Sequence, residues 1–262
     1  MAPLAHTLAL LAMTVATTAI EVKRLDMAWG SFDDQYQDCD LDMTKALPAL
    51  NRSEFKQNPL FAQAWVEARD EWQLKGSPAS PLSSPAQAIA IMAYTMNILY
   101  KEFNAAVRKA GRSRREYRDN FHFKALHFLL TDALATLRGT QGQQCYDVYR
   151  GVRDVRFKAK RGDTVRFGQF ASTSLCKDIA RRFGNSTVFQ VETCHGAVIQ
   201  KFSFYPTEKE VLIPPFETFE VTDVTQDGDS TQIQLRSTGT RSKFNCEWLR
   251  GDVTEGTAWG DG

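Results

Sequence analysis

The stretch that decides the fold is TLRGTQGQQCYDVYR, residues 136–150, because the spacing of apolar residues changes within it. Before this stretch apolar residues recur every three or four positions, as on one face of an α-helix. After it they alternate, as on one face of a β-strand. Helices followed by strands are typical of an α+β protein. The sequence therefore predicts a helical N-terminal half packed on a mainly antiparallel β-sheet.

The helical part is expected over about residues 42–138, and the β-rich part over about 143–238. Together they form a single domain over residues 20–250, followed by a short tail at 251–262.

Proline and glycine mark the ends of the expected helices. Asn58-Pro59 begins a helix that ends at Gly76, and Ser84-Pro85 begins a long helix that runs to about Gly111. A third helix is expected from about Asn120 to Leu137. The basic run at residues 112–118 is interpreted as a solvated loop.

Short alternating segments predict the strands of the second half. They lie at residues 145–150, 164–167, 187–192, 198–204, 210–213, 218–224 and 231–236, with one brief helix at 177–183.

Composition excludes several classes of protein. The 262 residues are 43% hydrophobic and carry a net charge of +1, so the chain can bury a core but has no excess of positive charge for binding nucleic acid. The glycine-rich dinucleotide and phosphate loops, the serine-hydrolase elbow and the zinc-protease motif are missing. The histidines do not cluster, so no metal site is predicted.

The N-terminus is typical of a secreted protein. Residues 1–19 contain no Lys, Arg, Asp or Glu and include an apolar run ending in small residues, as in a cleaved signal peptide; the alternative is a buried N-terminal helix. In an oxidising compartment the five cysteines would give two disulfides and one unpaired thiol, with the pairing left open by spacing alone. Asn51 and Asn185 are glycosylation candidates.

No second hydrophobic segment and no apolar tail for a lipid anchor is found in the sequence. We therefore expect a monomer without a stable membrane anchor, in the extracellular fluid or the lumen of secretory granules.

Two carboxylates, Glu208 and Glu210, stand one residue apart before the apolar run at residues 211–213. On an extended chain they would share a face, roughly 6 to 7 Å apart. Cleavage of a glycosidic bond uses such a pair, because one group stabilises a cationic sugar and the other manages the nucleophile. The commoner explanation is the solvated face of an edge strand.

Arg150 and the hydroxyl run Ser172-Thr173-Ser174 also stand out. Arg150 shares a strand face with apolar residues, where its guanidinium could bind a pyrophosphate or form a structural salt bridge. The three hydroxyls precede the brief helix, where they could cap it or reach a sugar hydroxyl.

In this order, Arg150, Ser172-Thr173-Ser174 and Glu208-x-Glu210 resemble the signature of the vertebrate arginine-specific mono-ADP-ribosyltransferases, the ecto-enzymes. The resemblance extends from about residue 25 to residue 248. It includes NFHFKALH at residues 120–127, VYRG at 148–151 and FGQFASTS at 167–174.

The resemblance implies the ADP-ribosyltransferase fold and NAD, or NADP, as a co-substrate, with no retained cofactor. ADP-ribose would pass to arginine side chains of acceptor proteins, or to small guanidino compounds, as nicotinamide leaves. Arg150 would hold the phosphates and Ser172 the nicotinamide ribose. Glu210 would bind the ribose 2′-hydroxyl and stabilise the cation, while Glu208 would hold the acceptor arginine.

The resemblance implies three further contacts with NAD, from Tyr149, Gly151 and Phe183. The Gly151 backbone would lie near the nicotinamide amide, and Phe183 would stack on the ring. The loop before Glu208, with Phe204 and Tyr205, would contact the target protein.

Family likeness also implies the disulfides Cys39–Cys246 and Cys145–Cys194, which leave Cys176 unpaired. Two alternatives to the transferase stay open from the sequence. One is an NAD glycohydrolase, in which water captures the sugar cation, and the other is a catalytically silent secreted binding module.

Overall fold

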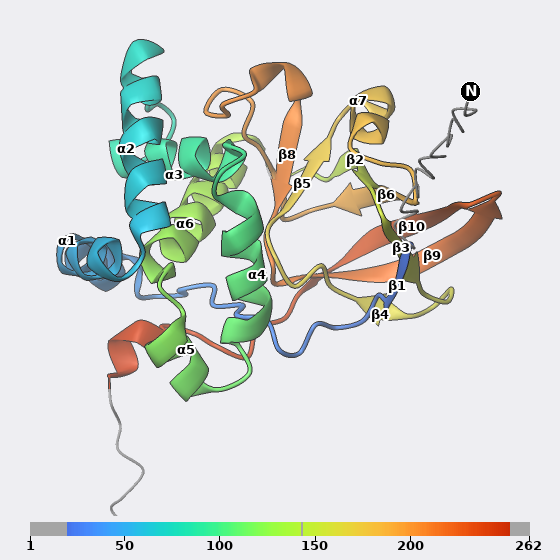
Figure 1. The fold of residues 1–262 in the computed structure, drawn as a ribbon, viewed down its shortest axis with the longest axis horizontal. Coiled ribbons are helices and arrows are strands. Elements are labelled where there is room, and N and C mark those ends of the chain that lie inside the picture. The colour runs from blue at the N-terminus through green and yellow to red at the C-terminus, as the bar shows by residue number, and fades with distance from the viewer. Residues whose placement is uncertain (1–19, 143, 252–262) are drawn as a thin grey trace, which may run out of the picture.

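The computed structural model describes residues 20–142 and 144–251. Helices from the first half of the chain gather on one side, and strands from the second half lie on the other (Figure 1). The α+β prediction is therefore confirmed, and the two parts pack on each other. The expected signal peptide at residues 1–19 and all of the tail but residue 251 lie outside the described residues.

The helical layer is built from helices whose apolar faces bury a common core. Its members are α1 (Asp40–Gln57), α2 (Pro59–Leu74), α3 (Pro85–Thr95), α4 (Tyr100–Ala110), α5 (Arg114–Asn120) and α6 (Lys124–Thr140). Asn58 and Ser84 cap α2 and α3 as expected, because each side chain accepts a hydrogen bond from a backbone N–H of the first turn. Within the described residues, no helix combines the length and the apolar character needed to cross a membrane.

The single long helix predicted from residue 84 to 111 is wrong, because one helix ends at Thr95 and a second begins at Tyr100. The Thr95 hydroxyl bonds back to the carbonyl of Ile91 (3.0 Å), and Met96 takes an extended backbone conformation. Thr95 Oγ1 also accepts a hydrogen bond from the Phe204 N–H (2.9 Å). A hydrogen bond between residues 109 positions apart in the sequence thus lies at the point where α3 ends. The next helix, α4, begins only at Tyr100.

The basic run at residues 112–118 is not a loop, since most of it forms α5. Ser113 caps this helix by accepting from the Glu116 N–H (3.0 Å). Tyr117 is fully buried, and its ring stacks on Phe32 at 4.2 Å between centroids. The pattern Ser-x-x-Glu at residues 113–116 is a capping signal that the charge run concealed.

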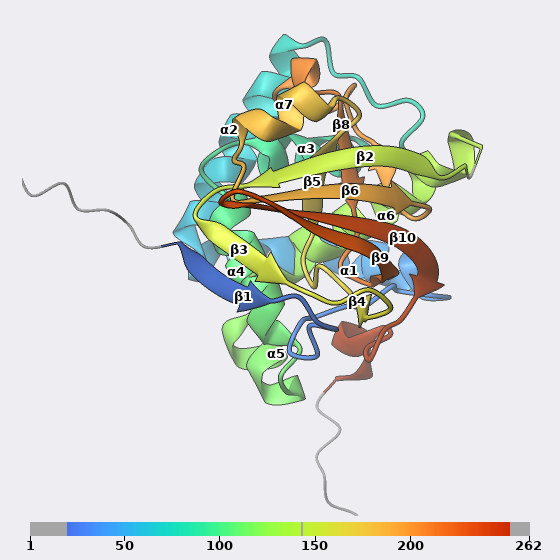
Figure 2. The same ribbon diagram turned by 90° about the vertical axis from the view of Figure 1, so that its right-hand side faces the viewer.

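The strands form one large sheet and a small one. They are β1 (Glu21–Arg24), β2 (Tyr146–Val152), β3 (Val155–Lys158), β4 (Thr164–Val165), β5 (Ala171–Ser174), β6 (Thr187–Thr193), β7 (Ala197–Val198), β8 (Glu210–Ile213), β9 (Glu217–Asp227) and β10 (Ser230–Thr240). The large sheet has the order β4-β9-β10-β6-β2-β5-β8-β7. Its broad face is seen in Figure 2, with the helical layer behind it.

Most neighbouring strands are antiparallel, as predicted, but β10 pairs with β6 in parallel, and so does β1 with β3. Strands β1, β3 and β5 were not predicted. The strand expected at residues 198–204 is wrong beyond Val198, because the chain turns there. The turn carries Ile199 and Phe202 into the core of the helical layer, which alternation along a strand would not do.

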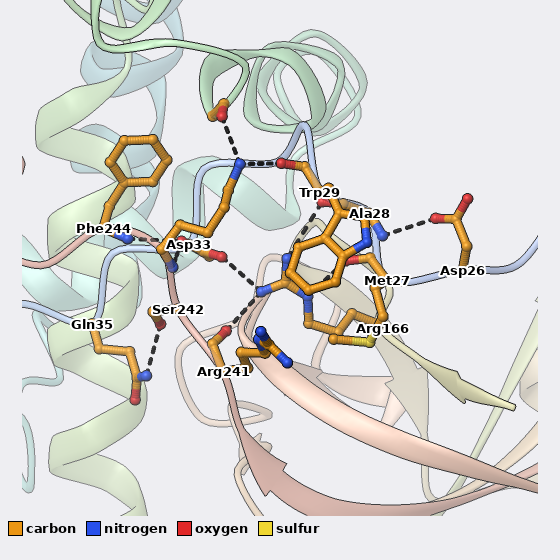
Figure 3. Close-up of polar contacts among 12 residues, drawn as sticks. Asp26, Met27, Ala28, Trp29, Asp33, Gln35, Arg166, Arg241, Ser242 and Phe244 are labelled. Carbon is orange, nitrogen blue, oxygen red and sulfur yellow. Dashed lines mark hydrogen bonds and ion pairs between the residues drawn. The ribbon is translucent and has the colours of Figure 1, made fainter.

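Both ends of the domain are tied together by buried polar groups (Figure 3). Arg166 is 1% exposed and donates to a carboxylate oxygen of Asp33 (2.7 Å) and to the carbonyl of Arg241 (2.6 Å). The other Asp33 oxygen accepts from the N–H of Lys243 (2.8 Å). A buried ion pair is tolerated here because backbone groups satisfy its remaining hydrogen-bonding atoms.

Two disulfides close the fold, with the pairing that family likeness implied. Cys39–Cys246 joins the segment before α1 to the C-terminal segment, beside the Asp33 and Arg166 contacts. Cys145–Cys194 links the neighbouring strands β2 and β6. Cys176, at the start of α7 (Lys177–Arg182), is the free thiol among the described residues.

Candidate active site

A pocket of about 360 Å³ lies between the helical layer and the large sheet. Helices α3 and α4 form one wall, strands β2 and β5 form the other, and the end of α7 stands at the side. The pocket brings together every residue predicted for catalysis or NAD binding: Tyr149, Arg150, Gly151, Ser172, Phe183, Glu208 and Glu210. The sequence spreads these residues over 62 positions, so only the fold makes them neighbours.

Arg150 reaches the pocket from the middle of β2. Its Nη1 donates to the carbonyl oxygen of Ser172 on β5 (2.5 Å). Burial lowers the pKa of the Arg150 guanidinium from its usual value, but an arginine of this kind stays charged at neutral pH. Arg150 forms no ion pair with a carboxylate within residues 20–142 and 144–251, so the salt-bridge alternative is wrong. The pocket therefore contains a fixed positive charge.

Glu210, the first residue of β8, lies at the bottom of the pocket and is 4% exposed. The pKa of the Glu210 carboxyl is raised to about 7, mainly by burial and in smaller part by the nearby Glu208 charge. Hydrogen bonds from Ser172 and Ser203, and the Arg150 charge, act in the opposite direction. Glu210 is therefore poised between its acid and its carboxylate near neutral pH.

Glu208 does not share a strand with Glu210, so the simple picture of two acids on one extended face is wrong. It ends a 3₁₀ turn, η1 (Pro206–Glu208), and Lys209 then adopts a left-handed conformation (φ 50°) before β8 begins. The Glu208 carbonyl accepts from the Ser174 hydroxyl (2.7 Å), which fixes the turn to β5. Glu208 is only half-buried, so one acid lies deep in the pocket and the other near the opening.

The N-cap residue of α7, Cys176, makes no side-chain cap hydrogen bond, but Ser174 Oγ of the hydroxyl run accepts from the Cys176 N–H (3.0 Å). Thr173 donates to the carbonyl of Val211 (2.6 Å), and Ser174 donates to Glu208. Ser172 points to the pocket and to the helical wall. The hydroxyls of Thr173 and Ser174 thus hold β5, β8 and the turn at Glu208 in one arrangement.

Gly151 and Phe183 form the side of the pocket next to α7. A Cβ on Gly151 would lie 2.3 Å from the carbonyl oxygens of both Ala180 and Gly184, so only glycine allows β2 to approach α7 this closely. Phe183 is 52% exposed at the pocket, an unusual position for a large apolar ring.

Sequence reasoning missed the helical wall of the pocket. Tyr94 from α3 and Asn104 from α4 are buried there, and Arg108 lies one turn beyond Asn104. The Arg108 guanidinium donates to the side chain of Gln169, just before β5. The available signal was a polar residue, Asn104, inside an otherwise apolar helical stripe.

One group of potential metal ligands, Cys145, Glu192 and Cys194, is close enough to share an ion. Its two sulfurs are joined in the disulfide, so they cannot act as thiolate ligands. It also lies outside the pocket residues.

Comparison with known proteins finds one family model and several proteins that match most of this chain. The family model described as NAD:arginine ADP-ribosyltransferase matches residues 25–243. NAD(P)(+)--arginine ADP-ribosyltransferase 2 of Gallus gallus is 51% identical over 241 residues, covering 91% of this chain and 76% of the relative. GPI-linked NAD(P)(+)--arginine ADP-ribosyltransferase 1 of Mus musculus is 50% identical over 86% of this chain and 73% of its own.

One solved structure shares this fold over nearly the whole of that structure's own length. The crystal structure of the eucaryotic mono-ADP-ribosyltransferase ART2.2 superposes with a TM-score of 0.74 at 35% sequence identity, covering 85% of this chain and 98% of its own. A variant of ART2.2 was solved in complex with NAD, and it superposes with a TM-score of 0.73.

Proposed function

Because this chain belongs to the NAD:arginine ADP-ribosyltransferase family and is an arginine-specific mono-ADP-ribosyltransferase that uses NAD(P), we propose that the pocket between α3, α4 and the sheet carries the reaction. NAD is consumed there as a substrate. The bond between nicotinamide and ribose breaks, and ADP-ribose passes to the guanidinium of an acceptor arginine.

Arg150 binds the pyrophosphate of NAD in this proposal. Its charge is already oriented by the hydrogen bond to the Ser172 carbonyl, and its planar fork matches two phosphate oxygens. Ser172 then contacts the nicotinamide ribose. Tyr149, Gly151 and Phe183 complete the NAD site, with Phe183 stacked on the nicotinamide ring, where its exposed face is available.

Glu210 stabilises the cation. When nicotinamide leaves, positive charge develops on the ribose next to a carboxylate that is shielded from water, where electrostatic stabilisation is strong. The carboxylate, not the acid, performs this role. The positive charge of bound NAD and of the transition state favours that form, so binding should lower the raised pKa of Glu210.

Glu208 handles the acceptor. An arginine guanidinium is a weak nucleophile because it holds its proton up to a pKa above about 12. Glu208, half-buried nearer the opening, orients this group and helps to remove its proton. Phe204 and Tyr205 precede η1, so they would contact the acceptor protein. Small guanidino compounds could reach the same position.

The observation that carries the proposal is the single pocket in which a buried carboxyl, a fixed guanidinium and a second, half-buried carboxyl meet. Glu210→Gln should retain NAD binding, measured by calorimetry, and lose at least about a thousandfold in nicotinamide release, of the order seen when one charge-stabilising group is removed. An undiminished rate in the folded variant would disprove the assignment of Glu210.

The alternative of an NAD glycohydrolase uses the same cation with water as acceptor. Labelled NAD supplied with agmatine distinguishes the two reactions. Nicotinamide release without ADP-ribosyl-agmatine, at high agmatine concentration, would support the hydrolase. A protein that binds no NAD would support the silent binding module.

Extracellular or cell-surface location is supported by the two disulfides and by the names of relatives such as Ecto-ADP-ribosyltransferase 5 of Homo sapiens, 44% identical over 91% of this chain and 85% of its own. Within that range, we propose that the protein is a monomer in the extracellular fluid or in secretory granules. Residues 1–19 would be removed as a signal peptide, and residues 20–250 would form one catalytic domain.

Asn185 is the better glycosylation candidate. It is exposed between α7 and β6, whereas Asn51 lies inside α1 with a shielded side-chain oxygen. Mass spectrometry of the secreted protein, before and after enzymatic removal of N-glycans, tests both the glycan and the expected N-terminus at Ile20.

A further inference from the structure

Tyr94 joins the helical layer to the strand that carries Ser172. Its ring is 1% exposed at the end of α3, and its hydroxyl donates to the carbonyl of Phe170 (2.9 Å), the residue before β5. The same hydroxyl lies 3.5 Å from Ser172 Oγ. Asn104 Nδ2 donates to the Tyr94 hydroxyl (3.1 Å) and to the Phe170 carbonyl (3.1 Å). Side chains from α3 and α4 thus bond the same backbone carbonyl, just before β5.

We propose that Tyr94 is a positioning residue that holds the Ser172 hydroxyl in place for the substrate ribose and governs how much of that hydroxyl's hydrogen bonding reaches Glu210. The inference rests on the function proposed above for Ser172 and Glu210. Tyr94 acts through Ser172 and does not itself carry out a chemical step.

The hydroxyl proton of Tyr94 already takes part in a hydrogen bond. A hydroxyl has one proton, and that of Tyr94 lies on the Phe170 carbonyl, so toward Ser172 and Asn104 the Tyr94 oxygen can only accept. Ser172 also has one proton, which it can give to Tyr94 or to the Glu210 carboxyl. Tyr94 and Glu210 therefore compete for the same donor.

The protonation of Glu210 decides which partner Ser172 chooses. Beside the protonated acid, Ser172 can accept from Glu210 and donate to Tyr94; beside the carboxylate, it donates to Glu210. The charged and titratable groups that face Glu210 are Arg150 on β2 and Glu208 on η1, with the Tyr94 phenol on α3. Within the described residues, neither Arg150 nor Glu208 bonds the Ser172 hydroxyl. Tyr94 is therefore the acceptor that competes with the Glu210 carboxylate for the Ser172 proton.

Tyr94→Phe removes the competing acceptor and keeps the buried ring. Ser172 then donates to Glu210 alone, which favours the carboxylate, so the acidic limb of the pH profile of kcat should move to lower pH. Ser172 is then drawn to Glu210 and away from the position that Tyr94 gives it for the ribose, so kcat on its plateau should fall about tenfold, while KM for NAD changes less than about twofold.

The matched control is Tyr117→Phe. The Tyr117 hydroxyl is equally buried and has no hydrogen-bond partner in the part of the chain that the structure describes, and Tyr117 does not line the pocket. This variant removes the same atom from the same helical layer. Its kcat and its pH profile should match those of the unmodified protein.

A double-mutant cycle tests whether Tyr94 acts through Ser172. Nicotinamide release from NAD with agmatine is measured for the full chain and for Tyr94→Phe, Ser172→Ala and the double variant, each checked for folding by thermal denaturation. Tyr94→Phe should lower kcat about tenfold alone and less than twofold in the Ser172→Ala background. Unchanged kcat in Tyr94→Phe, an unmoved acidic limb, or an equal loss in both backgrounds would overturn the inference.

Failure of this inference can be told from failure of the proposed site. If Glu210→Gln abolishes nicotinamide release while Tyr94→Phe has no effect, only the role of Tyr94 is wrong. If Glu210→Gln retains full activity, both are wrong, because Tyr94 would then have no catalytic carboxylate to influence.

Discussion

Glu210→Gln should make the folded protein more stable above pH 7 and change its stability little at pH 4. The Glu210 carboxyl is 4% exposed, and burial raises its pKa from 4.5 to about 7. The unfolded chain releases this proton near pH 4.5. Between the two pKa values the folded state binds the proton and the unfolded chain does not, so stability falls as pH rises through this window.

The size of the effect follows from the shift. One pKa unit corresponds to about 1.4 kcal/mol, so ionising the buried carboxyl costs about 3 kcal/mol at pH 8. Glutamine has the same shape and no charge, which removes this cost. Its amide needs a new acceptor in the pocket, and we therefore expect a net gain of about 1 to 3 kcal/mol. For a domain of this size, that gain raises Tm by roughly 3 to 10 °C.

Urea denaturation followed by tryptophan fluorescence measures the gain, at pH 5 and pH 8, without NAD and with the disulfides intact. The variant should gain about 1 kcal/mol or less at pH 5 and the full amount at pH 8. Glu192→Gln is the control, because Glu192 lies exposed on β6. A variant that is no more stable than the unmodified protein at pH 8, or a gain independent of pH, would refute the raised pKa of Glu210.

Three further predictions concern the acceptor and the ties between the two ends of the domain. Glu208→Gln should lower the formation of ADP-ribosyl-agmatine about a hundredfold or more, while nicotinamide release stays within a few-fold by chromatography; an equal loss of both products would contradict the acceptor role. Arg166→Met leaves Asp33 charged in a buried site and should cost about 3 to 5 kcal/mol in urea denaturation, and a loss below about 1 kcal/mol would show that the pair is dispensable. The double variant Cys39→Ser and Cys246→Ser should lose about 4 to 5 kcal/mol in the same assay, because the disulfide spans 207 residues; a loss near zero would mean that the Asp33 and Arg166 contacts suffice.

The residues proposed for the chemistry could be identified from the sequence. Arg150, Ser172, Glu208 and Glu210 occur in an order that resembles a known signature, and each stands beside a short apolar strand. The wall that faces them could not, because Tyr94 and Asn104 look like ordinary members of apolar helices until the fold turns them toward Ser172.

Local spacing by itself determined the α+β class, most helices and strands, and the positions of the acids and the arginine, because these depend on residues a few positions apart. Tertiary structure alone decided the break after Thr95, the turn at Glu208, the parallel pairing of β6 with β10 and the burial of Glu210. Each of these depends on contacts between distant segments, such as the hydrogen bond from Phe204 to Thr95. Burial also sets the charge state of Glu210, since the removal of water around a carboxyl is a property of the packed fold and not of neighbouring residues in the chain.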